Sequence, residues 1–533
     1  MKNYLFAGLS LTVVGACTTQ TKEPAKKPNI LYIMSDDHAY QAVSAYGFGL
    51  NQTPNIDRIA REGMRFNNCF VTNSISGPSR ATMLTGKFSH KNGFYDNGGR
   101  TFFDGSQQTI QKILQEAGYY TGIVGKWHLN STPIGFDYYS IHYGQGQYYN
   151  PDFMEEGEQR VRYEGYATDL TADNAIKFIN NRDADKPFCL LMHFKAPHRE
   201  WMPGPDKLLM YEDVTFPLPA TYYDKYEGRI AAQQQMMRID EEMSMGRDLK
   251  THGEWDTIPH NELRRMTPAQ RTAWDNVYNP IIEDFAKKRP TGNELSEWKF
   301  QRYMRDYMKC ISSVDDNVGR VLNYLEQIGE LDNTIIIYTS DQGFYLGEHG
   351  WFDKRFMYEE SFKTPFVIRY PKAIKSAGSV TNAMIQNLDF ASTLLDLAGL
   401  PIPGDIQGES FKDILTGKKQ TIKDAIYYHY YEFPLPHAVK KHYGVRTDRY
   451  KLIHFYNDID EWELFDLQND PNELKNLIND PSQAANIAAL KKKLTELQVK
   501  YEDTDPTSDA YLNEQFRFWE KYNAERGQNQ SAR

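Results

Sequence analysis

The chain has 533 residues, of which 40% are hydrophobic, so it is long enough to bury one large core and a second, smaller one. Its formal net charge is −10, and acidic and basic residues are interspersed without a basic patch, which argues against nucleic acid as a partner. Cys69, Cys189 and Cys310 are scattered without the spacing of a metal site, so we expect buried free thiols.

The N-terminal segment has the pattern of an export signal. Residues 5–14 form an apolar stretch that is too short to span a bilayer. The stretch ends in Val-Gly-Ala-Cys, which resembles a bacterial lipobox. That resemblance implies a lipoprotein signal peptide over residues 1–16 and a lipid anchor at Cys17, in the periplasm or outer membrane. Residues 17–27 are polar and are expected to form a tether. The alternative is a signal peptide that is cleaved without lipidation.

From Pro28 onwards, strands and helices are predicted to alternate. Apolar runs predict buried strands at Ile30–Met34, Tyr119–Val124, Pro187–Phe194 and Thr334–Thr339. A Thr-Pro pair at 53–54 predicts a helix start, and apolar residues at helical spacing predict helices over 110–117 and 311–328. This alternation favours an α/β domain with a largely parallel sheet flanked by helices, over residues 28–424.

Each of the four predicted strands is followed by charged or imidazole side chains. These segments are Ser35–His38, Gly125–His128, Lys195–His198 and Ser340–Gly343. In open α/β sheets the functional crevice lies at the carboxyl ends of the strands. We therefore expect the four segments to form one composite polar site.

The pattern changes at Ala425 to short strand-like runs followed by a single helix. The runs are 425–431, 443–446, 450–455 and 463–467, and the helix is 490–499. They predict a smaller antiparallel sheet with a packed helix, which forms a C-terminal subdomain over residues 425–526.

The segment 76–86 reads Ser-Gly-Pro-Ser-Arg-Ala-Thr-Met-Leu-Thr-Gly. Pro78 suits a helix start, so Ser76 is expected just before a helix N-terminus, where developing negative charge is stabilised. Arg80 adds a positive charge one turn later. The alternative is an ordinary capping serine. The segment closely resembles the signature of the type I sulfatase family, a Cys or Ser followed by x-Pro-x-Arg and a Leu-Thr-Gly ending.

The resemblance extends from about residue 28 to about residue 477 and implies an alkaline-phosphatase-like fold. It implies that a sulfatase-maturing enzyme oxidises Ser76 to formylglycine (3-oxoalanine), whose hydrated aldehyde is the nucleophile. The modification is chemically needed, because a sulfated serine has no second hydroxyl and could not release its sulfate in this way. A geminal diol keeps a second hydroxyl, whose deprotonation expels sulfate.

The resemblance also implies a calcium site. Asp36, Asp37, Asp341 and Gln342 match the family's ligands, and position 76 would complete the shell together with a sulfate oxygen. Three carboxylates and one amide oxygen suit a hard cation. Family members often have Asn or His at this position. Gln342, like Asn, has a side-chain carbonyl oxygen that can bind the metal. Either acidic pair alone would be better explained as a cap or a turn.

Five cationic or imidazole residues match family positions. They are Arg80, Lys126, His128, His198 and Lys354. The resemblance implies that His128 is the base in sulfate release, that His198 protonates the leaving alcohol and that Lys354 binds sulfate oxygens.

The substrate is indicated by four further residues. The segments that contain Trp201, Asp353, His437 and His442 resemble bacterial N-acetylglucosamine-6-sulfatases, which act on glycosaminoglycan-type or mucin-type glycans. We expect Asp353 to accept hydrogen bonds from sugar hydroxyls, and both histidines to reach the ring from the C-terminal subdomain. An equally open alternative is that these residues only join the two subdomains.

The expected activity is therefore hydrolysis of the 6-O-sulfate of N-acetylglucosamine on a sulfated glycan. Close alternatives are an iduronate-2-sulfatase or another glycan sulfatase. From other classes, a phosphate or phosphonate ester hydrolase of the same fold and a non-catalytic binder of sulfated glycans remain open.

Overall fold

The computed structural model describes residues 26–98, 101–251 and 261–513, together with Met1 and positions 517, 520, 521 and 524. The predicted signal peptide, Cys17 and nearly all of the tether lie outside the described residues. None of the described helices combines the length and the apolarity needed to cross a membrane.

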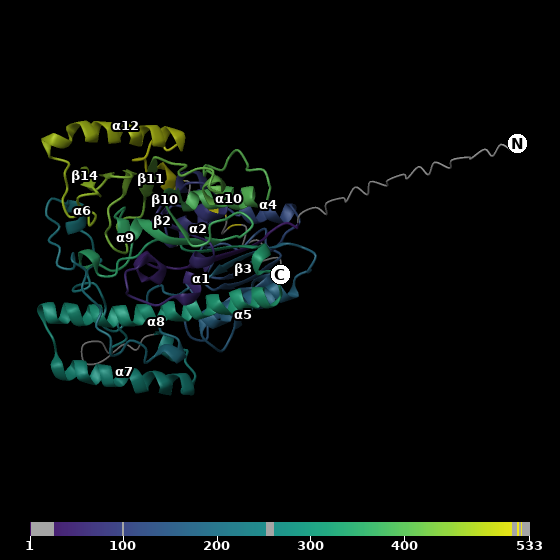
Figure 1. The fold of residues 1–533 in the computed structure, drawn as a ribbon. Coiled ribbons are helices and arrows are strands. Elements are labelled where there is room, and N and C mark those ends of the chain that lie inside the picture. The colour runs from purple at the N-terminus through teal and green to yellow at the C-terminus, as the bar shows by residue number, and fades with distance from the viewer. Residues whose placement is uncertain are drawn as a thin grey trace.

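A ten-stranded sheet forms the centre of the molecule (Figure 1), in the order β10-β2-β9-β8-β1-β7-β3-β4-β5-β6. Its strands are β1 (Asn29–Ser35), β2 (Met64–Phe70), β3 (Tyr120–Gly125), β4 (Tyr138–His142), β5 (Asp152–Glu155), β6 (Gln159–Arg162), β7 (Phe188–His193), β8 (Thr334–Ser340), β9 (Lys363–Arg369) and β10 (Ser379–Gln386). The five consecutive strands from β8 to β4 are mutually parallel, while β9, β5 and β6 run antiparallel to their neighbours. The predicted α/β class with a largely parallel sheet is therefore confirmed.

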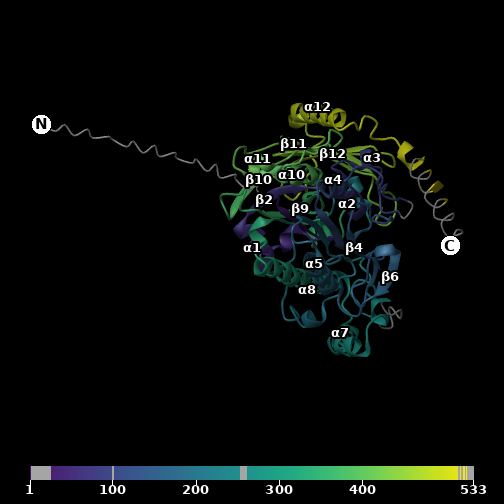
Figure 2. The same cartoon turned by 90° about the vertical axis from the view of Figure 1, so that its right-hand side faces the viewer.

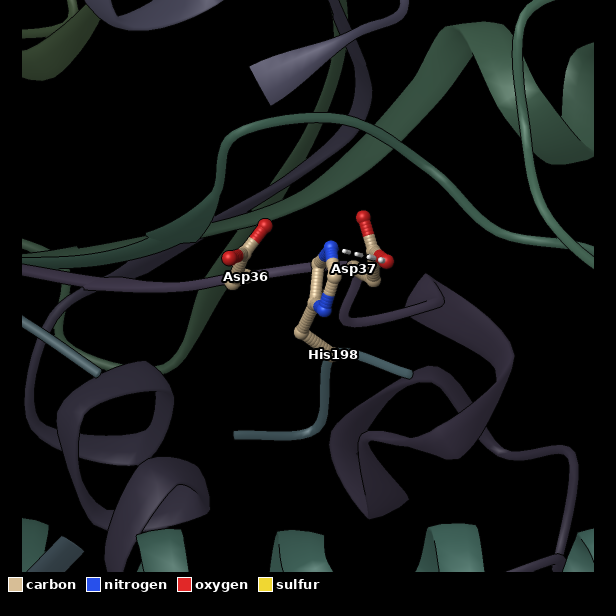
Figure 3. Close-up of side chains that lie close together, drawn as sticks. All are labelled: Asp36, Asp37 and His198. Atoms are coloured by element: carbon tan, nitrogen blue, oxygen red, sulfur yellow. Dashed lines mark ion pairs between the residues drawn. The ribbon is translucent and has the colours of Figure 1, made fainter. Parts of the chain in front are cut away.

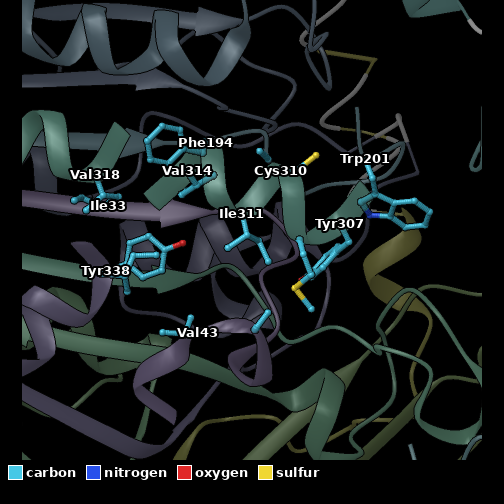
Figure 4. Close-up of a cluster of buried hydrophobic side chains, with 14 of the residues drawn as sticks. Ile33, Val43, Phe194, Trp201, Tyr307, Cys310, Ile311, Val314, Val318 and Tyr338 are labelled. Atoms are coloured by element: carbon cyan, nitrogen blue, oxygen red, sulfur yellow. The ribbon is translucent and has the colours of Figure 1, made fainter. Parts of the chain in front are cut away.

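Helices cover both faces of this sheet because its central strands are buried on both sides. The helices are α1 (Pro54–Glu62), α2 (Ser76–Thr85), α3 (Ser89–Asn92), α4 (Ile110–Glu116), α5 (Ala167–Asn181), α6 (Ile230–Gln233), α7 (Pro268–Lys288), α8 (Gly292–Gln327), α9 (Glu359–Phe362), α10 (Phe390–Leu397), α11 (Lys412–Leu415) and α12 (Ala484–Lys500). Helices α1, α5 and α8 share a core with Leu31 and Ile33, whereas α2, α4 and α10 share the opposite core with Ile30 and Tyr32. Figure 4 shows Ile311 and neighbouring side chains of α8 in the first core.

One helix start differs from the prediction, and another is as predicted but is capped differently. Helix α8 begins at Gly292, well before residue 311, because its first half is buried through Phe300, Tyr303 and Tyr307 rather than through aliphatic residues. Helix α1 does begin after Thr53, but the backbone N–H of Ile56 donates to Asp315 of α8 at 2.8 Å. The helix is thus capped by a carboxylate that is distant in sequence.

The C-terminal part contains the smaller antiparallel sheet, confirming that element of the predicted fold. Its strands, in the order β11-β12-β13-β14, are β11 (Ala425–Tyr430), β12 (His442–Thr447), β13 (Tyr450–Phe455) and β14 (Glu461–Asp466). Helix α12 packs on one face, and the other face packs on Trp351, Phe356 and Phe362 of the larger domain. Figures 1 and 2 show α12 and α7 at opposite ends of the molecule.

Candidate functional site

The four strand ends lie at one edge of the sheet, because β8, β1, β7 and β3 are adjacent and parallel. The backbone N–H of Asp37, after β1, donates to the Asp341 carboxylate, after β8, at 3.1 Å. Lys126, after β3, forms an ion pair with Asp36. Nε2 of His198, after β7, lies 3.9 Å from the Asp37 carboxylate, as Figure 3 shows. The expected composite site is therefore formed.

Ser76 is the first residue of α2, so the helix begins two residues before Pro78. Its Oγ donates to Asp36 at 2.9 Å, and its side chain is buried. The next backbone N–H, of Gly77, donates to Asn97 at 3.0 Å. A Cβ on Gly77 would lie 2.4 Å from the Phe94 ring, so this position requires glycine for close packing. The start of α2 is thereby fixed with Ser76 directed at the acidic cluster.

Arg80 lies one turn further along α2 and is fully buried. Its Nη2 donates to Asp341 at 3.0 Å, and its Nη1 donates to the Lys126 carbonyl at 2.9 Å. Although burial alone would raise the pKa of Asp341, Arg80 and Lys126 hold that pKa below its usual value. Asp341 is therefore a permanent carboxylate in the interior.

Asp37 is the second strongly connected acid of the cluster. Lys354 Nζ lies 2.6 and 2.7 Å from its two carboxylate oxygens, and the side-chain amide of Gln342 also donates to it. Burial raises the pKa of Asp37 to about 7 against the attraction of Lys354. The backbone of Asp37 has φ 64°, a conformation that is uncommon for a residue other than glycine.

The donor set fits a divalent cation. Asp36, Asp37 and His198 each offer a ligand atom, and these atoms lie within 4.8 Å of one another. Oε1 of Gln342 is buried and has no hydrogen-bond partner, although its amide nitrogen faces Asp37. An orphaned carbonyl oxygen beside carboxylates is an oxygen ligand suited to calcium. This group contains Asp36 and Asp37 of the predicted ligand set, adds His198, which was predicted as the proton donor, and does not include Asp341.

Acidic and basic side chains are equally numerous in the cluster. Three buried carboxyl groups, of Asp36, Asp37 and Asp341, face three basic side chains, which are Arg80, Lys126 and Lys354. A divalent cation would add positive charge to the site. An anionic sulfate ester would then be attracted into it.

The two candidate acid–base residues are neutral imidazoles. Burial, together with Lys126 and Arg80, lowers the pKa of His128 well below its usual value. Burial and the ammonium groups of Lys126 and Lys354 do the same to the pKa of His198. Donation of a proton by His198 therefore needs a nearby anion that offsets these cations, and a bound sulfate group is such an anion.

Two residues near these histidines were not among the predicted catalytic residues. The side-chain amide of Gln145 lies 2.7 Å from Nε2 of His128. Lys195 is buried, with its Nζ 3.4 Å from the Gln145 carbonyl and 4.8 Å from the centre of the Tyr148 ring. Lys195 lies in one of the segments that follow the predicted strands, so its position in the sequence could have identified it as a site residue. Gln145 lies in a loop without any motif.

Asp353 and His437 lie beside the charged cluster. Asp353 accepts from the backbone of Lys354 at 2.9 Å and from Nε of Arg355 at 3.1 Å, and Nε2 of His437 lies 3.3 Å from its other oxygen. Although burial opposes it, the surrounding His437, Lys354 and Arg355 hold the pKa of Asp353 well below its usual value. The two residues are therefore adjacent to the residue predicted to bind sulfate.

His442 and Trp201 lie in the protein interior. Nε2 of His442 accepts from the Met357 backbone at 3.1 Å, and Nδ1 faces the Lys440 carbonyl at 2.7 Å. Trp201 is fully buried and packs on Tyr303 with ring centres 4.6 Å apart, within the core of Figure 4. Both side chains are buried, and their contact with the sugar stays a prediction. His442 joins the second sheet to Met357 of the larger domain, as the alternative expects, whereas Trp201 packs within the larger domain.

Comparison with known proteins gives two family matches. The model of the sulfatase family matches residues 28–400. A second model, described as the C-terminal part of N-sulphoglucosamine sulphohydrolase, matches residues 347–500. Together they span the α/β domain and most of the C-terminal subdomain.

Individual proteins agree with these matches. The N-acetylglucosamine-6-O-sulfatase of Bacteroides thetaiotaomicron is 52% identical over 515 residues, which are 94% of this chain and 92% of that protein. An arylsulfatase of Clostridium perfringens is 28% identical over 510 residues, covering 88% of this chain and 94% of its own.

Solved structures show the same relationship. A structure described as a complex with its substrate D-glucosamine-2-N,6-O-disulfate matches with a TM-score of 0.88 and 52% identity, over 91% of this chain and 100% of that one. A phosphonate monoester hydrolase of Agrobacterium radiobacter matches with a TM-score of 0.65 and 21% identity, over 89% of this chain and 96% of that one, and so shares the fold alone. Because the family model covers well over half of the sequence and a relative is 52% identical over nearly all of it, the chain belongs to the sulfatase family.

Proposed function

We propose that this protein hydrolyses sulfate esters on glycans, and that its substrate is the 6-O-sulfate of N-acetylglucosamine. The observation that carries the substrate assignment is the Asp353–His437 pair directly beside Lys354. A carboxylate and an imidazole beside the sulfate position are suited to sugar hydroxyls. The 52% identity to an N-acetylglucosamine-6-O-sulfatase supports this choice.

We further propose that Ser76 is converted to formylglycine by a maturing enzyme, and that Asp36, Asp37, Asp341 and Gln342 hold calcium. Formylglycine would supply a hydrated aldehyde with two hydroxyls, and calcium would supply positive charge beside it. The orphaned Oε1 of Gln342 and the hydrogen bond from Ser76 to Asp36 support these assignments.

The residues of the chain then have separate tasks. Lys126 and Lys354 stabilise the charge on the sulfate oxygens, and the start of α2 adds its backbone dipole. Nε2 of His198 gives a proton to the alkyl leaving oxygen, which needs one because an alkoxide is a poor leaving group. His128 takes a proton from residue 76 when sulfate is released, and its lowered pKa keeps it neutral for that step.

The location of the protein is a separate proposal. We infer from the lipobox pattern at residues 14–17 that Cys17 carries a lipid anchor to the periplasmic side or the outer membrane. Replacement Cys17→Ala is expected to move the protein from the membrane fraction to the soluble fraction. Wild-type protein recovered without lipid would contradict this assignment.

Two measurements test the proposed function. Mass spectrometry of the peptide that contains residue 76 should show formylglycine in protein from the native host, and protein that keeps an unmodified serine should be nearly inactive. Release of sulfate is then compared for N-acetylglucosamine-6-sulfate, galactose-6-sulfate and a 2-O-sulfated uronate. A clear preference for either of the last two would overturn the substrate assignment but not membership in the family.

A further inference from the structure

A pocket of about 280 Å³ lies next to His128 and is not used by the proposed mechanism. Its lining combines aromatic rings with small polar side chains: Phe102, Trp127, His128, Asn130, Thr132 and Tyr143. Ligand pockets usually measure about 300 to 1,000 Å³, so this one is of a size for a small part of a larger ligand.

The pocket and the reactive centre share structural parts. His128 lines the pocket and also belongs to the catalytic set. Residues 143–146 form a tight turn, in which the N–H of Gly146 donates to the Tyr143 carbonyl at 3.2 Å. Tyr143 of this turn forms a wall of the pocket, while Gln145 contacts His128 at 2.7 Å. A ligand in the pocket therefore lies beside the catalytic imidazole.

The Tyr143 wall is accessible and is contacted by an arginine. Half of the Tyr143 side chain is exposed, and the Arg160 guanidinium lies 4.5 Å from the ring centre. Arg160 is itself held by the buried Asp152 through hydrogen bonds of 2.5 and 3.2 Å. An accessible aromatic ring suits stacking against the apolar face of a sugar.

The other walls favour recognition of a ring rather than of a charge. None of the described residues that line the pocket is Asp, Glu, Lys or Arg. His142 is buried, and neither of its ring nitrogens has a partner. Burial lowers the pKa of His142 to about 3, so it is a neutral hydrogen-bonding group. Ser131 Oγ is also buried without a partner, and the Asn130 and Thr132 side chains, which donate to Thr101 and Glu158, still offer acceptor oxygens.

We propose that this pocket is a subsite for the sugar residue joined to the one that carries the sulfate ester. The inference rests on the proposed function, since it needs a glycan substrate at the reactive centre. It adds that the enzyme recognises at least two linked sugars. Ring stacking and hydroxyl contacts suit a neutral hexose better than a uronic acid, because the described lining offers no cation for a carboxylate.

The test compares kcat/KM for N-acetylglucosamine-6-sulfate with that for two disaccharides, in which the same sugar is linked to a neutral hexose or to a uronic acid. In Tyr143→Ala we expect about a tenfold loss on at least one disaccharide, equivalent to about 1.4 kcal/mol, and less than about a twofold change on the monosaccharide. Tyr143→Phe should retain most activity because it keeps the ring. The disaccharide that is affected identifies the neighbour.

The matched control is Tyr223→Ala, which removes a tyrosine of similar exposure that lines a different pocket. It should leave all three substrates unchanged. Equal losses on monosaccharide and disaccharides in Tyr143→Ala, or no loss on either disaccharide, would overturn the subsite while the proposed function stands. Wild-type protein that releases sulfate from none of the three would refute the proposed function, and the subsite with it.

Discussion

Replacement Asp341→Ala should destabilise the fold as well as abolish activity. The Asp341 carboxylate receives Nε and Nη2 of Arg80 at 3.2 and 3.0 Å, and the backbone N–H of Asp37 at 3.1 Å. Arg80 is 1% exposed, and its next carboxylate, Asp36, is 4.0 Å away. Without Asp341 the guanidinium stays buried and loses the carboxylate oxygen, Oδ2, that accepts two of its N–H groups.

The size of the effect follows from this burial. Removing one partner of a buried ion pair costs about 3–5 kcal/mol, because an uncompensated charge remains. With an unfolding entropy of about 2.1 cal/mol/K per residue, a cooperative chain of 533 residues loses about one degree of Tm per kcal/mol. We therefore expect Asp341→Ala to lower the Tm by about 3–5 °C.

The assay is a double-mutant cycle of thermal unfolding with Asp341→Ala, Arg80→Ala and the double variant. Because the second replacement removes the stranded partner, the double variant should lose clearly less stability than the sum of the two single losses. Strict additivity would refute the reasoning, as would an unchanged Tm in Asp341→Ala. Sulfate release should be abolished in all three variants.

Three further predictions concern metal, substrate and pH. Removing calcium with a chelator should lower both the Tm and the activity, and added calcium should restore them. Gln342→Leu should weaken the calcium-dependent rise in Tm. A Tm that does not change with calcium would refute the site. We expect a loss of about tenfold or more in kcat/KM for the glycan in both Asp353→Ala and His437→Ala, with a much smaller change for a small aryl sulfate. Equal losses on both substrates would exclude a role in sugar recognition. Burial raises the pKa of Glu463 to about 8, so its contribution to stability is complete below its unfolded pKa near 4.5 and is lost as the pH rises towards 8. The Tm of Glu463→Gln should thus fall less than that of the wild type between pH 5 and pH 8, and parallel curves would contradict the shift.

Four of the ten strands of the large sheet could be predicted from the sequence, but the strand order could not, and β2, β4, β5, β6, β9 and β10 were not predicted. Continuous apolar runs identified β1, β3, β7 and β8, because strands buried on both faces have no polar alternation. The short strands β5 and β6 lack such a run, and β6 is largely exposed. Adjacency depends on which runs pack together across more than 300 residues, as β1 and β8 do. That information is absent from local patterns.

The sequence predicts where the polar residues after the strands meet better than it predicts the burial of His442 and Trp201, for a physical reason. Asp36, Lys126 and Asp341 each follow a buried strand directly, so the sheet alone determines where they meet. His442 and Trp201 belong to segments whose burial is decided by tertiary packing. A histidine in a strand of the second sheet faces either the surface or the core, and the sequence does not distinguish these cases.

The cost of the charged cluster indicates that it is retained for its chemistry. Buried ion pairs are often no more stable than apolar residues of the same volume, so the core would lose little by replacing them. The backbone adds a further cost, because Asp37, His128, Asp353 and Arg355 have φ of 64°, 55°, 79° and 101°, in the left-handed region. Such conformations cost on the order of 1–3 kcal/mol each and persist only where the surrounding structure enforces them. These four are among seventeen described non-glycine residues with positive φ, and they lie in the cluster or beside it. The fold therefore holds charge and strain at the carboxyl edge of the sheet, where an anionic ester bound among Arg80, Lys126 and Lys354 would meet groups already in position.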